Sequence, residues 1–390
     1  MPRLLHMADV HLGARHRDLG EAATRQRERQ LAAFRRGLEA GLAARVDVAL
    51  ICGDLFDSNA QPRRTVEVAA TELRRLTEKG IRVVLIPGTH DSYEAGSIYR
   101  VFDLRLMAGL SEGSDLLTVL TPERPDVVFR DVDLVVYGRV AATKRVSRSP
   151  LADFTTAAES RGRWRVAMIH GSMVIPGKVE QDDVIFSSTE VAASGLDYLA
   201  LGHWHSWLTG QAGSTTWAYP GAPEPLALDQ TGAGRVAIVN LEERAGERVV
   251  TVEPVTVGRT RFGSLELAAT EIPSQAALVN RLMGLADPDL ILDVRVGGVA
   301  TQRLDIDTDA VARELSVSFL KLRIQDRSVA ALPEGPLPPP DTIAGAFMRD
   351  LEARITAAEA IGDEGAAEEA REALQLGRLL IDDPRHVDLV

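Results

Sequence analysis

The feature that most constrains this sequence is an apolar run, residues 48–52, that stops at a glycine. The run reads Val-Ala-Leu-Ile-Cys, and the residues Gly53-Asp54-Leu55-Phe56-Asp57 follow it. Near-continuous apolar runs of this length are typical of strands buried on both faces, as in parallel sheets. Ligands of open α/β sheets bind beyond the carboxyl ends of such strands, so Asp54 is predicted to face a binding site. A lone Gly-Asp pair would more simply place an aspartate at the cap of the next helix.

Four other predicted strands end in the same way, with the side chains Asp9 and His11, His90 and Asp91, His170, and His203 and His205. Because the carboxyl ends of parallel strands lie along one edge of a sheet, we expect all five strand ends to converge there. Residues two apart on an extended backbone point to the same side, so Asp9 and His11 can reach one ion. Five of the eight histidines belong to this set, and we interpret His6, His16 and His386 as ordinary residues.

The side chains at these strand ends are carboxylates and imidazoles, with no thiolate. Such a set suits Mn, Fe or Zn better than Ca. An aspartate that bridges two ions would hold them about 3.5–4 Å apart, an arrangement that lowers the pKa of a bound water and clamps the oxygens around phosphorus. The sequence therefore predicts a metal site that hydrolyses a phosphate ester.

Apolar residues at helical spacing predict helices over residues 21–45 and 63–79, and another helix around 98–110. The first of these segments begins with several arginines. We interpret them as a solvated helix face, partly neutralised by Glu21 and Glu28, rather than as phosphate contacts.

Length and composition narrow the class of protein. A chain of 390 residues is too long for one ordinary core, so two or more domains are expected. A single cysteine, Cys52, excludes internal disulfides and fits a reducing compartment. No run approaches the ~20 apolar residues of a membrane span, and no signal peptide precedes the first strand. We therefore expect a soluble cytoplasmic protein.

The net charge of -12 is unevenly distributed. Residues 331–390 hold 13 acids and five arginines, so most of the negative charge lies in this tail. The net charge argues mildly against a protein that coats nucleic acid in general, but local basic patches in the first 330 residues are compatible with it.

The pattern changes near residue 258 to alternating short strands and helices, which predicts a small α+β domain. Five prolines between residues 333 and 340 indicate a stiff linker, and two amphipathic helices follow. A two-helix hairpin cannot bury both apolar stripes alone, so it is expected to dock on another surface. We divide the chain into a first domain (1–257), a small α+β domain (258–330), a linker (331–340) and a C-terminal helical segment (341–390).

In chain order, the motifs Asp-x-His, Gly-Asp-x-x-Asp, Gly-x-His-Asp, a lone His and Gly-His-x-His resemble the calcineurin-like metallophosphoesterase superfamily over residues 1 to about 255. The resemblance implies an α/β fold, a sandwich of two stacked sheets flanked by helices. It also implies two sets of metal ligands: Asp9, His11, Asp54 and His205 for one ion, and Asp54, His170 and His203 for the other. By the same resemblance His90 faces the leaving oxygen as general acid or transition-state donor, and Asp57 orients it.

One residue departs from the family pattern. Relatives have asparagine where this chain has Thr89, and the asparagine amide oxygen is a ligand of the second metal. A threonine hydroxyl is a poorer neutral ligand, so we expect Thr89 either to bind weakly or to leave a water in that position. The second metal site is therefore expected to be weak.

Within the superfamily, residues 8–13, 53–57, 201–205 and 219–221 resemble the DNA double-strand-break repair exonucleases of the SbcD-like branch. This implies a Mn-dependent DNA exonuclease, with endonuclease activity left open. By the same resemblance residues 1–257 are the nuclease domain, residues 258–330 are a capping domain that helps to position DNA, and residues 341–390 dock on a partner. It implies a homodimer joined through the helices at 21–45 or 63–79, and C-terminal helices that dock on an SbcC-like SMC/ABC-type ATPase subunit. Two alternatives stay open: a phosphodiesterase for nucleotides or other small esters, and a non-catalytic scaffold whose metal site is weakened at Thr89.

Overall fold

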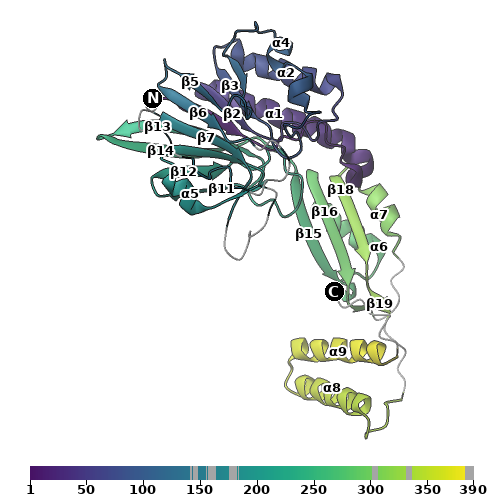
Figure 1. Ribbon diagram of the computed structural model, residues 1–390. Coiled ribbons are helices and arrows are strands. Elements are labelled where there is room, and N and C mark those ends of the chain that lie inside the picture. The colour runs from purple at the N-terminus through teal and green to yellow at the C-terminus, as the bar shows by residue number, and fades with distance from the viewer. Residues whose placement is uncertain are drawn as a thin grey trace. The chain divides into compact units, whose positions relative to one another are not determined.

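The computed structural model of this chain describes residues 1–140, 143, 148–154, 156, 164–174, 182, 184–300, 306–330 and 336–382. The chain divides into two compact units, Met1–Thr260 and Arg261–Val390, and Figure 1 labels many of their helices and strands. The metal-capable strand ends all belong to the first unit. Part of the predicted linker, 331–335, and the last residues, 383–390, lie outside the described residues.

The first unit is built on two six-stranded sheets. The first sheet has the order β14 (Glu247–Thr256), β13 (Arg235–Arg244), β1 (Arg3–Met7), β2 (Val48–Cys52), β3 (Arg82–Ile86) and β4 (Leu117–Val119). Strands β1 to β4 are parallel, and β13 and β14 complete the sheet antiparallel to their neighbours. The parallel part therefore places the ends of β1, β2 and β3 side by side.

The second sheet has the order β11 (Leu208–Ala212), β12 (Thr215–Tyr219), β10 (Tyr198–Gly202), β7 (Trp164–His170), β6 (Leu134–Gly138) and β5 (Asp126–Phe129). Its four inner strands are parallel and its two edge strands antiparallel. In register, Gly202 at the end of β10 pairs with His170 at the end of β7. A small two-stranded ladder, β8 (Ser172–Met173) with β9 (Ile185–Phe186), follows β7.

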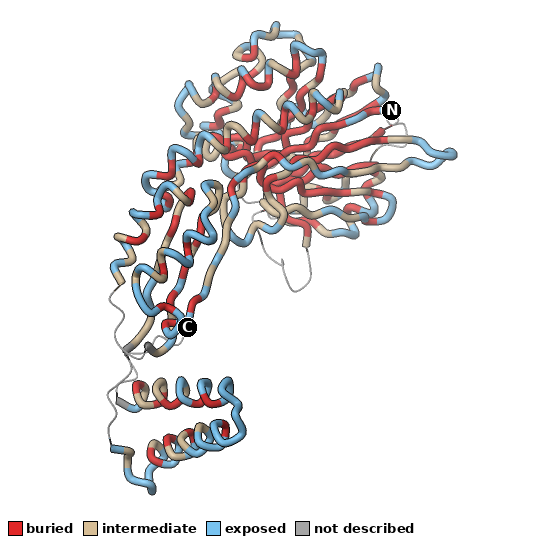
Figure 2. Tube along the Cα trace, turned by 180° about the vertical axis from the view of Figure 1, so that it is seen from behind, coloured by how far each residue is buried: buried red, intermediate tan, exposed pale blue. Residues whose placement is uncertain are grey.

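Alternation along the buried strands creates the layers. In β2, Val48, Leu50 and Cys52 face the second sheet, whereas Ala49 and Ile51 face the helices. The helical layer on that face includes α1 (Ala23–Ala44) and α2 (Arg63–Thr77). On the outer face of the second sheet, α5 (Ser188–Ala193) packs through Val191. The predicted sandwich of two sheets between helices is confirmed, and Figure 2 shows its buried residues concentrated along the strands.

Two glycines bring α1 close to the first sheet. A Cβ atom at Gly37 would lie 2.4 Å from Met7 Cε, and one at Gly41 would lie 2.9 Å from Leu5 Cδ2. Larger side chains at these positions would push the helix away from β1, the strand that precedes the first pair of metal-capable residues.

A buried histidine joins the two sheets. His6 of β1 is fully buried, and its Nε2–H donates to the Leu201 carbonyl oxygen (3.1 Å) at the end of β10. Its Nδ1 accepts a hydrogen bond from the Tyr198 hydroxyl (2.7 Å). Burial lowers the pKa of His6 to about 3, so the imidazole is neutral at ordinary pH. The interpretation of His6 as a residue outside the metal site agrees with these contacts.

The helices of the first unit follow the predictions with one correction. Helices α1 and α2 lie within the predicted ranges, and a 3-10 helix, η1 (Arg17–Ala22), precedes α1. The single helix expected around residues 98–110 is wrong: the structure has two short helices, α3 (Ile98–Val101) and α4 (Leu104–Met107). Phe102 is extended between them, and the Asp103 carboxylate caps α4 by accepting from the backbone N–H groups of Arg105 and Leu106.

The second unit begins with a three-stranded parallel sheet, β15 (Arg261–Ala268), β16 (Asp287–Gly297) and β18 (Phe319–Asp326). Its helices are η2 (Ala269–Glu271), α6 (Gln275–Met283) and α7 (Thr308–Glu314), and β17 (Val299–Ala300) pairs with β19 (Val329–Ala330). Leu278 of α6 and Val311 of α7 share a core with the sheet. The structure thus has the alternating short strands and helices predicted for this segment, with β17 and β19 in addition.

A helical hairpin, α8 (Ile343–Ala360) and α9 (Glu364–Asp382), ends the described part of the chain. Its core is small: Met348 and Leu351 of α8 pack with Leu374 of α9. Ile343 and Ile361 are 92% and 80% exposed. Across the described residues, none of the helices has the length and apolar character needed to cross a membrane.

Candidate metal centre

The candidate metal centre lies where strands of both sheets end. Asp9 and His11 follow β1, Asp54 follows β2, and Thr89 and His90 follow β3 of the first sheet. The remaining candidates come from the second sheet: His170 ends β7, and His203 and His205 follow β10. The expectation that all five strand ends share the edge of one sheet is therefore wrong, because β7 and β10 pair with each other rather than with β1 to β3.

Four of the candidate ligands have unusual backbone conformations. Asp9, His11 and Asp54 have φ angles of 55°, 50° and 49°, and His203 has a φ of 104°. Positive φ is uncommon for residues with a Cβ atom and costs free energy, so it persists where surrounding contacts hold it, often at functional sites. The extended backbone expected for Asp9 and His11 is therefore wrong, although their side chains still belong to one cluster.

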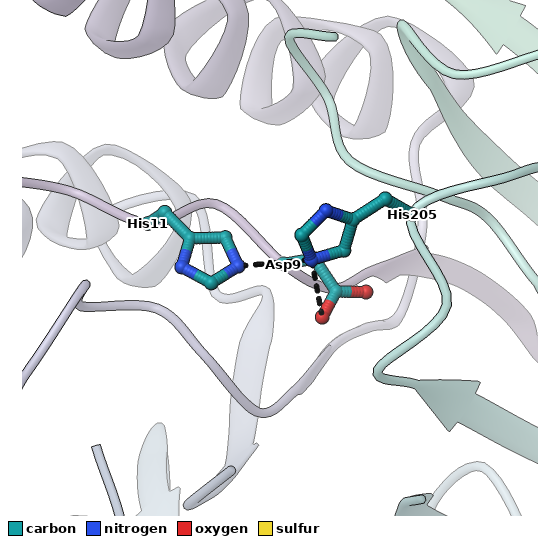
Figure 3. Close-up of side chains that lie close together, drawn as sticks. All are labelled: Asp9, His11 and His205. Carbon is teal, nitrogen blue, oxygen red and sulfur yellow. Dashed lines mark hydrogen bonds and ion pairs between the residues drawn. The ribbon is translucent and has the colours of Figure 1, made fainter. Parts of the chain in front are cut away.

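The first cluster contains Asp9, His11 and His205 (Figure 3). The Nε2 atoms of the two imidazoles are 3.1 Å apart, and His205 Nε2 lies 3.9 Å from Asp9 Oδ1. Asp9 and His11 are buried, at 1% and 2% exposure. Two imidazole nitrogens and a carboxylate oxygen that converge in this way are a donor set suited to a divalent transition metal.

The second cluster is centred on Asp54. Asp54 Oδ2 lies 3.1 Å from His170 Nε2 and 3.4 Å from Thr89 Oγ1. Thr89 Oγ1 lies 3.5 Å from His170 Nε2, so the three atoms form a compact triangle. The other ring nitrogen of His170, Nδ1, donates to the Cys52 carbonyl oxygen (2.8 Å), which leaves Nε2 free to act as a ligand.

Asp54 connects the two clusters. Its Oδ2 atom also lies 3.9 Å from His11 Nε2 of the first cluster. Burial by itself would raise the pKa of Asp54, but the charge and hydrogen bond of His170 lower it. Conversely, burial would lower the pKa of His170, but Asp54 and Asp9 raise it. The carboxylates thus stabilise positive charge at His170, which is the electrostatic property that a site for divalent cations needs.

His203, another predicted ligand, contacts an aspartate outside the two clusters, Asp182. Its ring lies beside that of His170, with centroids 5.3 Å apart, but its Nε2 is 3.0 Å from Asp182 Oδ2. Asp182 also accepts a hydrogen bond from the Ser172 hydroxyl, which in turn accepts from Trp204 Nε1. The backbone N–H of His203 donates to the Asp9 carboxylate (3.0 Å). Because Nε2 faces Asp182, Nδ1 is the atom of His203 that remains to bind a metal.

His90 and Asp57 are close to each other and to His11. The contact between His90 and Asp57 involves the main chain: His90 Nδ1–H donates to the Asp57 carbonyl oxygen (2.9 Å). The Asp57 carboxylate lies instead 3.6 Å from His11 Nδ1, and the hydrogen bond to His11 lowers the pKa of Asp57. His90 is exposed, so its ring is accessible to solvent or to a bound substrate.

Sequence reasoning placed Asp91 at a strand end but gave it no role. This carboxylate is fully buried and accepts hydrogen bonds from the backbone of Gly88 (2.7 Å), Asp54 (3.2 Å) and Phe56 (3.1 Å). The Tyr99 hydroxyl donates to it as well (2.6 Å). Burial, together with the charge of Asp54, raises the pKa of Asp91. Asp91 therefore holds the loops after β2 and β3 together, a role that depends on contacts distant in sequence.

Glycines allow these loops to approach closely. A Cβ atom at Gly202 would lie 2.0 Å from the Cys52 carbonyl oxygen and 2.8 Å from His170 Nδ1. Gly53 has a φ of 83°, and a Cβ there would lie 2.3 Å from the same His170 atom. Any other residue at these positions would displace His170 or the strand beside it.

Comparisons with known proteins agree with this geometry. The profile of the calcineurin-like phosphoesterase family matches residues 2–207. The DNA double-strand break repair protein Mre11 of Aeropyrum pernix is 32% identical over 237 residues, which cover 59% of this chain and 55% of that protein. One subunit of the nuclease SbcCD of Escherichia coli K12 is 25% identical over 287 residues, covering 66% and 69%. An uncharacterized metallophosphoesterase of Bacillus subtilis, YhaO, is 24% identical over 235 residues, covering 58% and 54%. The chain spans about half the length of the first of these relatives.

Proposed function

The chain belongs to the calcineurin-like phosphoesterase family, and we propose that it is a metal-dependent DNA phosphodiesterase that acts in DNA repair. The proposed activity is that of an exonuclease, with endonuclease activity left open. The observation that carries the proposal is the position of Asp54, whose carboxylate lies within 3.9 Å of imidazoles in both clusters. The relatives named as break-repair proteins and as part of a nuclease support DNA as the substrate.

The residues at the site fit two divalent ions, and we propose that both ions are Mn. Asp9, His11, Asp54 and His205 would hold the first, and Asp54, Thr89, His170 and His203 the second. Bound in this way, the pair would supply an activated water and neutralise charge on the phosphate. Thr89 places its hydroxyl 3.4 Å from Asp54 Oδ2. Because a hydroxyl is a poorer neutral ligand than an amide oxygen, the second ion would be held more weakly than the first.

His90 is suited to move a proton at the leaving oxygen. Its Nδ1–H is held by the Asp57 carbonyl, which fixes the ring and leaves Nε2 as the exchanging atom. Its backbone N–H donates to Asp54 Oδ1 (2.7 Å), so the residue is tied to the proposed bridging carboxylate. In the imidazolium form, Nε2–H would donate its proton to the departing oxygen. Asp57 orients the ring through its carbonyl, and its carboxylate orients His11.

The proposal also includes an assembly. The exposed apolar residues of the hairpin, such as Ile343 and Ile361, would dock on an SMC/ABC-type ATPase subunit. The small α+β segment would act as a cap that positions DNA. The assembly further includes a homodimer joined through α1 or α2. A cytoplasmic location is part of the same proposal.

The test is digestion of end-labelled linear DNA, duplex and single-stranded, by purified full-length protein with Mn. We expect degradation that a chelator abolishes and that His90→Ala reduces by about 10²–10⁴-fold, the usual range for losing a general acid. A bis-ester reporter is assayed in parallel. Cleavage of the reporter without cleavage of DNA, in the presence of the ATPase partner as well, would favour a small-molecule phosphodiesterase. Inactivity on both substrates, together with no bound Mn, would favour a scaffold.

A further inference from the structure

Two buried glutamines lie one turn apart on the inner face of α1. Gln26 is 1% exposed and Gln30 is 2% exposed. A buried side-chain amide must find hydrogen-bond partners for both its donor and its acceptor atoms, or it destabilises the fold. The partners of these two glutamines show what each one holds in place.

Gln30 directs its whole amide at the loop that follows β1. Its Nε2 donates to the carbonyl oxygens of Val10 (3.4 Å) and His11 (3.3 Å). Its Oε1 accepts a hydrogen bond from His16 Nε2 (2.7 Å). One side chain on a rigid helix thus contacts both the ligand-bearing part of the loop and its far end.

The loop needs such support because its backbone is strained. Asp9, His11 and His16 all have left-handed conformations, with φ angles of 55°, 50° and 48°. Conformations of this kind persist only where neighbouring contacts over-determine them. On one side the His11 N–H donates to the Asp54 carbonyl oxygen (2.9 Å). On the other side Gln30 binds the His11 carbonyl oxygen, so the peptide groups on both sides of His11 are fixed.

We propose that Gln30 is a positioning residue for the first metal ion. It acts through the main chain of His11 and through His16, and it holds the loop so that the side chains of Asp9 and His11 face His205. The inference rests on the metal centre proposed above. Helix α1 would thus support metal binding, although none of the ligand motifs lies on it.

Gln26 provides a matched control on the same helix face. Its Nε2 donates to the Pro225 carbonyl oxygen (3.2 Å), and its Oε1 accepts from the Thr260 hydroxyl (2.9 Å). Its burial and its hydrogen bonds are comparable to those of Gln30, but its partners lie outside the ligand loops. Replacing either glutamine by methionine keeps the side-chain length and removes the amide. The two variants should therefore lose similar stability and differ in metal binding.

The experiment is calorimetric titration of Mn into metal-free full-length protein for the parent, Gln30→Met and Gln26→Met, with a thermal melt of each. We expect two ions to bind the parent. In Gln30→Met the tighter site should weaken about 10- to 100-fold, as is usual when a group supporting a ligand is removed. In Gln26→Met both affinities should stay within about threefold of the parent. Excess Mn should restore the phosphodiesterase activity of Gln30→Met.

A second substitution at the same position separates the two halves of the amide. Gln30→Glu keeps an acceptor for His16 but places an oxygen against the Val10 and His11 carbonyl oxygens, so we expect the same weakening of the tighter site. This variant carries the test if Gln30→Met does not fold. Parent-like affinities in the Gln30 variants, or equal losses in Gln26→Met, would overturn the positioning role. A parent that binds no Mn would overturn the proposed metal centre itself.

Discussion

Lowering the pH from 7 to 5 is predicted to destabilise the folded protein by about 2 kcal/mol through His6 alone. Burial lowers the pKa of this imidazole from 6.5 to about 3, whereas the unfolded chain keeps the ordinary value. Between these two values the unfolded state binds a proton that the folded state does not, so stability falls as the pH falls. The loss of stability due to His6 is small above pH 7. Between pH 6.5 and pH 3 it approaches about 1.4 kcal/mol for each pH unit by which the pH is lowered.

The assay is urea unfolding at pH 5, 6 and 7 in the presence of a chelator, for the parent and for the double variant His6→Met/Tyr198→Phe. The second substitution removes the hydroxyl that would otherwise lose its partner. Other groups also contribute to the pH dependence of stability, and the difference between parent and variant cancels their contribution. The variant should be less stable at pH 7 but lose about 2 kcal/mol less on going to pH 5. Equal pH dependence in the two proteins would refute a neutral, buried His6.

Three further predictions concern the metal site. Thr89→Asn should supply the better neutral oxygen and tighten the weaker Mn site by about tenfold, or roughly 1.4 kcal/mol, in a calorimetric titration; unchanged affinity would show that residue 89 is not a ligand. Gly202→Ala should lower the free energy of unfolding by about 1–3 kcal/mol and weaken Mn binding, since its Cβ would lie 2.0 Å from the Cys52 carbonyl oxygen and 2.8 Å from His170 Nδ1; a parent-like thermal melt would contradict the close approach. His90→Gln should lower kcat on a bis-ester while two Mn ions still bind, and loss of an ion in this variant would make His90 a ligand instead.

Much of the fold follows from local sequence patterns. The run at residues 48–52 predicts a strand buried on both faces, and in the structure its residues alternate between two cores. Periodicity likewise located α1 and α2 to within a few residues. The segment around residues 98–110 was less predictable, because its apolar spacing continues through a break that the Asp103 cap creates.

The distribution of strands between sheets could not be predicted from local pattern. Residues near His170 and His203 have the same apolar character as those near Asp54, and their sheet is decided by pairing partners far away in the chain. In the first sheet, for example, Leu4 pairs with Val239 of β13. The sequence pattern therefore identifies the residues at the strand ends. The division of these strands between two sheets depends on pairing between distant parts of the chain, which the pattern does not contain.

The supporting residues of the site were the hardest to find. Asp91 follows His90 in a motif, but its role depends on hydrogen bonds from the loop after β2 and from Tyr99. Gln30 has no signal beyond a polar residue on the inner face of a helix. The roles of His90 and Asp57 came from family resemblance, and the structure adds that their contact runs through a carbonyl oxygen.

The central claim, a two-metal centre bridged by Asp54, is tested most directly by anomalous diffraction from crystals of the full-length protein soaked in Mn. The account predicts two peaks about 3.5–4 Å apart, one on each side of the Asp54 carboxylate. The first should lie among Asp9, His11 and His205, and the second, with lower occupancy at limiting Mn, beside His170. The absence of any peak among these residues, or a single ion that does not contact Asp54, would contradict the claim.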